Sequence, residues 1–130
     1  MPGQIVISGP KEQVRQAVAE LRARGMRKIV ELTVAGAFHS RLMADAGVKL
    51  AGVLEKSTLA LPSIPVYQNF TAAPPASEAE LKSNLAAQVS GAVRWEACVR
   101  AAFAAGAEIM IEFGPGFRKS AARSCRDTIL

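Results

Sequence analysis

The sequence predicts an α/β fold in which short strands alternate with helices. Four stretches have the apolar character of a strand, at residues 4–8, 29–34, 66–70 and 109–113. Between them lie segments whose apolar residues recur every three or four positions, the spacing of an amphipathic helix. Strands that alternate with helices are typical of a largely parallel sheet covered by helices.

The first 34 residues are expected to form a strand, a helix and a second strand. Gly9-Pro10 opens the helix, because proline suits the first helical turn, and Gly25 ends it. The apolar face of this helix consists of Val14, Ala17, Val18 and Leu21.

Capping residues predict two helices in the middle of the chain. Ser40 can cap a helix that Gly47 weakens slightly. Ser77 and Glu80 fit a capping box, in which each side chain accepts a hydrogen bond from the other residue's amide. The apolar faces are Met43, Ala46, Leu50, Val53 and Leu54 for the first helix, and Leu81, Leu85 and Val89 for the second.

A further helix starts near Trp95 and ends at Gly106, with Trp95 and Phe103 expected in the core. The strand at 109–113 leads into the turn Gly114-Pro115-Gly116, where glycine permits tight backbone angles. A basic helix is expected to close the chain.

Composition narrows the class of protein. The chain has 130 residues, 50% of them hydrophobic, enough for one domain with a core. The longest apolar stretch, 101–111, is shorter than the roughly 20 residues that span a bilayer, and no signal-peptide pattern opens the chain, so a cytoplasmic location is expected. Cys98 and Cys125 form neither a disulfide framework nor a metal site, and no bound cofactor is expected.

The net charge of +5 is concentrated at the two ends of the chain. Residues 1–28 and 118–130 carry a positive excess, whereas the middle is slightly acidic. Such ends can attract nucleic acid, an anionic cofactor or an acidic protein partner, although each cluster alone is more simply explained as a solvated helix face. No aromatic residues interleave with the basic ones, so nucleic-acid binding is not expected.

His39 is the single histidine and the strongest candidate for chemistry. It lies between a predicted strand and a predicted helix, after small residues that leave room around its ring, and an imidazole in such a loop can act as a general base. The alternative is a capping or surface histidine. No Gly-x-Ser-x-Gly elbow occurs in the sequence, and neither cysteine has the context of a nucleophile. The residues alone leave the function undetermined.

Five motifs taken together resemble a known family. They are PGQIVISG at 2–9, VAGAFHS at 34–40 with Leu42-Met43, IPV at 64–66 with Asn69, VRWE at 93–96 and EFGPG at 112–116. In this order and spacing the chain is similar, over nearly its whole length, to malonyl-CoA:acyl carrier protein transacylases and to the acyltransferase domains of polyketide synthases. The similarity is to the C-terminal portion of these proteins.

The resemblance implies a division of the chain. Residues 1–34 correspond to the second half of an inserted ferredoxin-like subdomain, and residues 35–130 to the C-terminal part of an α/β-hydrolase-like acyltransferase core. Sheet edges left unpaired by this division favour association with a partner.

The resemblance also implies an activity. A serine of the family takes the malonyl group from malonyl-CoA and passes it to the phosphopantetheine thiol of acyl carrier protein, in fatty-acid or polyketide biosynthesis. His39 corresponds to the histidine that activates the serine and then the thiol.

The resemblance assigns roles to three more residues. Gln88 falls where a backbone carbonyl orients that histidine, although by itself it is a polar helix position. Phe38 matches the malonyl-type motif and would narrow the acyl pocket, or else simply packs. Asn69 matches a polar position near the site, or else serves a turn.

Several family features do not occur in this sequence. They are the nucleophilic serine, the glutamine loop of the oxyanion hole and the arginine that pairs with the malonyl carboxylate, so the isolated chain is predicted to be inactive. Three interpretations follow: a partial enzyme completed by a separate chain with the N-terminal half, a non-catalytic module that binds acyl carrier protein, or an inert remnant. The binding module would use Arg118, Lys119, Arg123 and Arg126.

Overall fold

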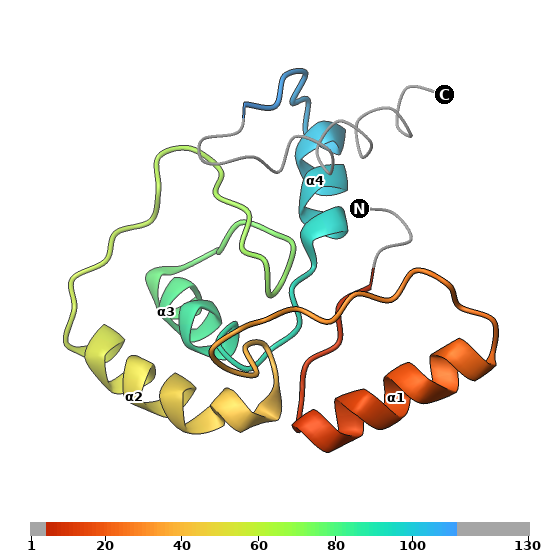
Figure 1. Ribbon diagram of the computed structural model, residues 1–130. Helices are drawn as coiled ribbons and strands as arrows, with labels where there is room; N and C mark the ends of the chain where they lie inside the picture. The colour runs from red at the N-terminus through yellow and green to blue at the C-terminus, as the bar shows by residue number, and fades with distance from the viewer. Residues whose placement is uncertain (1–4, 112–130) are drawn as a thin grey trace.

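The structure is a computed structural model that describes residues 5–111. Figure 1 shows α1 on one side of the molecule, α2 and α3 packed together, and α4 beyond them. The helices are α1 (Lys11–Ala23), the 3-10 helix η1 (Arg41–Met43), α2 (Ala44–Glu55), α3 (Glu78–Ala87) and α4 (Trp95–Ala104).

Helix α1 begins and ends as the sequence predicts. Pro10 occupies its N-cap, and its carbonyl accepts the first helical hydrogen bond from the Val14 amide at 3.0 Å. Gly25 has a φ of 87°, and its amide donates to the Arg22 carbonyl while the Met26 amide donates to that of Leu21. This pair of bonds is a Schellman motif, which requires the left-handed backbone that glycine adopts without strain.

Ser40 caps its helix as predicted, but the first turn is the 3-10 helix η1. The Ser40 hydroxyl accepts a hydrogen bond from the Leu42 amide at 3.3 Å, and α2 follows directly after η1. Gly47 does more than weaken α2. It is buried against α3, where an added Cβ would lie 3.3 Å from the Ala86 carbonyl oxygen, so glycine allows the two helices to approach closely.

The predicted capping box of α3 forms in one of its two halves. The Ser77 hydroxyl accepts from the Glu80 amide at 3.1 Å, but the Glu80 carboxylate accepts from the Ala76 amide at 2.8 Å instead of the Ser77 amide. Helix α4 starts at Trp95 and stops before Gly106, whose φ is 97°. Both helix starts therefore match the sequence-based expectation.

The four predicted strands are wrong for the described residues. Within 5–111 the only β pairing is an isolated antiparallel bridge between Gln68 and Ala73. Many apolar residues of the predicted strands face solvent; Ile5, Val30 and Ile109 are 87%, 79% and 80% exposed. A strand exists only when a neighbouring strand pairs with it, and residues 5–111 supply none.

The core of the described part is small. Its buried apolar residues are Val18, Cys98 and Val99, and Trp95, predicted to be in the core, is 46% exposed, while Phe103 is partly buried. Apolar surface exposed on this scale is typical of a region that contacts a partner. Among residues 5–111 no helix combines the length and the apolar character needed to cross a membrane. The last strand residues, the Gly-Pro-Gly turn and the basic helix predicted beyond it lie outside the described residues.

Candidate functional site

The C-terminal end of α3 holds His39 through two hydrogen bonds. The ring Nδ1 lies 2.9 Å from the carbonyl oxygen of Gln88, and the His39 amide donates to the carbonyl of Val89 at 3.2 Å. The last carbonyls of a helix have no partner within it, which leaves them free for this role. A carbonyl oxygen can only accept, so Nδ1 carries the proton in this geometry. In the neutral imidazole, Nε2 then keeps a free lone pair.

The backbone of His39 is in the left-handed region, with a φ of 59°. This conformation is uncommon for residues other than glycine, and neighbouring contacts must maintain it. Ser40 fixes the segment after the histidine, since its buried hydroxyl donates to the Ala37 carbonyl at 2.7 Å and accepts from the Leu42 amide. The loop is thus held on both sides of the ring.

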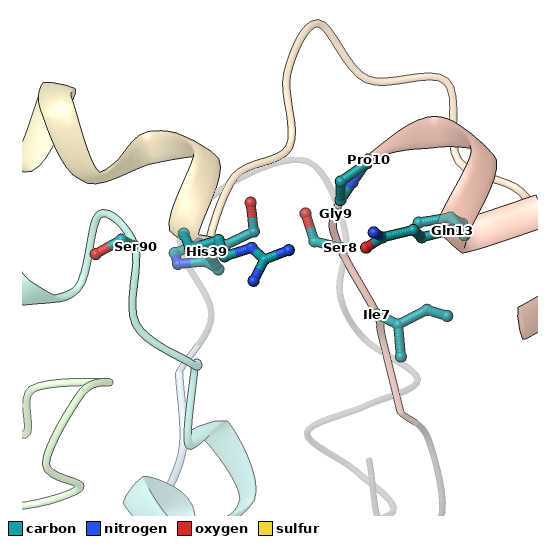
Figure 2. A pocket seen from close by; sticks show the side chains of 10 residues that line it. Ile7, Ser8, Gly9, Pro10, Gln13, His39 and Ser90 are labelled. Carbon is teal, nitrogen blue, oxygen red and sulfur yellow. The ribbon is translucent and has the colours of Figure 1, made fainter.

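A cavity of about 400 Å³ adjoins His39 (Figure 2). It lies between the start of α1, the start of η1 and the segment after α3, and Figure 2 shows Ser8 and Gln13 across the opening from His39. Arg41 is the one charged residue among those that line it. The lining residues are Ile7, Ser8, Gly9, Pro10, Gln13, Val14, His39, Ser40, Arg41 and Ser90.

This lining combines one cation and several uncharged polar groups with aliphatic surface. Arg41 forms no ion pair with a described residue, so its guanidinium is available to an anionic group. Gln13 and the serines can donate and accept hydrogen bonds, whereas Ile7 and Val14 offer apolar contact. Such a cavity can take a ligand that combines an anionic group with uncharged polar and apolar parts.

The two other predicted site residues do not line this cavity. Phe38 is 50% exposed and lies beside Gly36, and its predicted effect on acyl size stays a prediction. Asn69 has a buried side-chain oxygen that meets no hydrogen-bond donor within residues 5–111. Its backbone carbonyl accepts from the Arg94 amide at 2.7 Å, which fixes its position next to α4. A buried acceptor without a donor costs about 1–3 kcal/mol.

Sequence reasoning did not name Gln13, Arg41 or Ser90 as site residues. Ser8 appeared only inside a motif. These four residues lie around one cavity, although residues 8 and 90 are far apart in the chain. No local sequence pattern predicts that they are close in space. One signal was present, since Arg41 follows the Phe38-His39-Ser40 motif directly and brings a charge beside the candidate base.

Comparison with known proteins shows the family to which this chain is related. The model of the acyl transferase domain family matches residues 1–116. The chain therefore belongs to the acyl transferase domain family. It is 36% identical over 115 residues to the malonyl CoA-acyl carrier protein transacylase of Bacillus subtilis (strain 168), a match that covers 88% of this chain and 36% of the relative.

Solved structures give the same result. An acyl carrier protein S-malonyltransferase from Vibrio cholerae O1 superposes with a TM-score of 0.85 at 30% identity, over 91% of this chain and 39% of that one. A malonyl-transacylase in complex with a type II PKS acyl-carrier protein gives a TM-score of 0.79 at 32% identity, over 83% and 35%. The chain thus spans little more than a third of the length of the relatives it matches. Its fold is that of the corresponding part of an α/β acyltransferase.

Proposed function

We propose that this chain supplies the histidine half of a malonyl-CoA:acyl carrier protein transacylase site, with His39 as the general acid and base. The observation that carries the proposal is the 2.9 Å contact between His39 Nδ1 and the Gln88 carbonyl oxygen. It orients the ring and directs the free Nε2 away from α3. Gln88 thus acts through its backbone, and its side chain has no part in the contact.

The chemistry follows from that tautomer. Nε2 removes the proton from a serine hydroxyl of the remaining part of the domain, and the serine oxygen attacks the thioester carbon of malonyl-CoA. The carbon–sulfur bond breaks, and the imidazolium returns its proton to the departing thiolate of coenzyme A. In the second half the phosphopantetheine thiol gives its proton to Nε2, and its sulfur attacks the malonyl ester. Serine leaves with the proton from His39, so the base is regenerated.

The cavity beside His39 suits the pantetheine arm that both substrates share. That arm has two amides, a dimethyl group and a phosphate, matching Gln13, the aliphatic side chains and Arg41 respectively. Malonyl-CoA and acyl carrier protein are therefore the proposed substrates, and no bound cofactor is required.

We place the nucleophilic serine in polypeptide outside this sequence, because no Gly-x-Ser-x-Gly elbow occurs within it. The exposed apolar residues of the predicted strands offer a large surface for that polypeptide to cover. We accordingly expect the 130-residue chain alone to transfer no malonyl group. The basic residues of the alternative binding module, Arg118, Lys119, Arg123 and Arg126, lie outside the described residues.

The test is a chimera in which residues 1–116 replace the matched segment of the Bacillus subtilis transacylase, assayed for malonyl transfer to acyl carrier protein. We expect activity that falls by about 100- to 10,000-fold in His39→Ala, the usual range for loss of a general base. Ser83→Ala, an exposed change on α3, is the matched control and is expected to leave activity unchanged. A folded chimera with full activity after His39→Ala would refute the role of His39. The 130-residue chain mixed with a separate N-terminal half then tests whether two chains can share the site.

A further inference from the structure

Two buried amide side chains, Gln68 and Asn84, join the turn at 68–73 to α3. Each residue is only 7% exposed. The Asn84 Nδ2 donates to the Gln68 Oε1 at 2.8 Å, and the Gln68 Nε2 donates to the Leu81 carbonyl at 3.4 Å. Gln68 therefore forms hydrogen bonds with α3 at two positions, Leu81 and Asn84, about one turn apart.

The backbone of Gln68 is fixed equally well on its other side. Its amide donates to the Ala73 carbonyl at 3.1 Å, and its carbonyl accepts from the Ala72 amide at 2.8 Å. The same carbonyl accepts from the Cys98 thiol at 3.5 Å, which ties it to α4. Gln68 thus links α3, α4 and the turn whose next residue is Asn69.

Helix α3 connects the Gln68–Asn84 contact to His39. Asn84 lies one turn before Gln88, and the Gln88 amide donates to the Asn84 carbonyl at 3.0 Å. Rotation of a helix by about 20° moves a backbone atom at a radius of about 2.3 Å by roughly 0.8 Å. A shift of this size along the contact would stretch the 2.9 Å distance between the Gln88 carbonyl oxygen and His39 Nδ1 to about 3.7 Å, beyond hydrogen-bond range. The orientation of α3 therefore decides whether the ring is held.

A buried amide pair contributes little net stability, because both groups lose water when they meet. An apolar pair of similar shape would keep the protein folded but would not fix the rotation of α3. We propose that the Gln68–Asn84 contact is a positioning device that orients α3 and so holds His39 in its Nδ1–H tautomer. Its effect on turnover rests on the proposed transacylase function, whereas its effect on the tautomer does not.

The single histidine makes the geometric claim directly measurable. In the 130-residue chain, ¹⁵N NMR of the imidazole gives one pair of ring signals, whose shifts report which nitrogen carries the proton. The wild type and Ser83→Ala are expected to show the Nδ1–H tautomer. The apolar pair Gln68→Leu/Asn84→Leu should unfold at a similar denaturant concentration yet show a mixture of tautomers. The exchange Gln68→Asn/Asn84→Gln, which keeps both amides, should restore the single tautomer.

Turnover in the chimera provides the second readout. We expect kcat to fall about 10- to 100-fold in the apolar pair with KM changed less than about twofold, since misplacement of a reacting group by about 1 Å has effects of this size. The exchange variant should recover most of the loss. A folded apolar pair that keeps the Nδ1–H tautomer would overturn the proposal, as would a wild type that lacks this tautomer. An inactive wild-type chimera would count against the transacylase function alone, and the NMR result would still decide the positioning role.

Discussion

Gly91 is a position where a single methyl group should be costly. A Cβ built on it would lie 2.5 Å and 2.6 Å from two ring carbons of Phe70 and 2.9 Å from the Ala87 carbonyl oxygen. Distances below 3.0 Å force a shift, and here one of the neighbours is backbone at the end of α3. Overpacking of this kind costs about 1–3 kcal/mol. Because Gly91 follows the two carbonyls that hold His39, the displaced backbone should also loosen the ring.

Gly52 is the matched control. It lies in α2, is exposed and would place a Cβ in open space, so Gly52→Ala removes only the backbone entropy cost of a helical glycine. That substitution should stabilise the chain by about 0.5–1 kcal/mol. The two alanine variants should therefore differ by about 1.5–4 kcal/mol, which corresponds to a urea midpoint difference of about 0.5 M or more. Equal midpoints in urea unfolding would show that Phe70 does not pack on Gly91.

Three further predictions concern a cap, a thiol and the acyl pocket. Ser77→Ala should lower the free energy of unfolding by about 1 kcal/mol, because the Glu80 amide loses its acceptor; urea unfolding measures it, and an unchanged midpoint would contradict the cap. Burial raises the pKa of the Cys98 thiol above its ordinary value of 9.0, so the thiol loses its proton first in the unfolded chain and the free energy of unfolding should fall as pH rises past 9. Alkylation of Cys98, measured on its own peptide, should be slow in the native chain. Labelling as fast as in urea would refute the burial of this thiol. In an active chimera, Phe38→Ala should raise use of methylmalonyl-CoA relative to malonyl-CoA, and an unchanged ratio would remove Phe38 from specificity.

Helix boundaries were predictable because they depend on local chemistry. Gly25 and the serines at 40 and 77 act on amides or carbonyls within a few residues of themselves, and each does so in the structure. The Glu80 carboxylate shows the limit of such reasoning, since it reaches the Ala76 amide, one position before the predicted one. The type of helix was likewise not predictable after Ser40, where a 3-10 turn precedes α2.

The candidate site was predictable only in part, since its contacts join distant segments. The pairing of His39 with the Gln88 carbonyl spans 49 positions and followed from the family resemblance, not from any pattern in the residues. The cavity lined by Gln13 and Arg41 had no counterpart in that resemblance. Its existence depends on how the start of α1 lies against η1, a tertiary feature without a local sequence signal.

The failure of the strand predictions has a definite physical meaning. An apolar segment predicts that its side chains are buried in the functional protein. A β-strand also needs a neighbouring strand that pairs with it through hydrogen bonds. Ile5, Val30 and Ile109 satisfy the first condition in sequence but lie more than three-quarters exposed in the described part of the chain. Since the relatives are more than twice as long as this chain, the surface that buries these residues is best sought in the remaining part of the domain. Under the proposed transacylase function, the same polypeptide would also carry the nucleophilic serine. Burial of the apolar surface and completion of the site would then occur together.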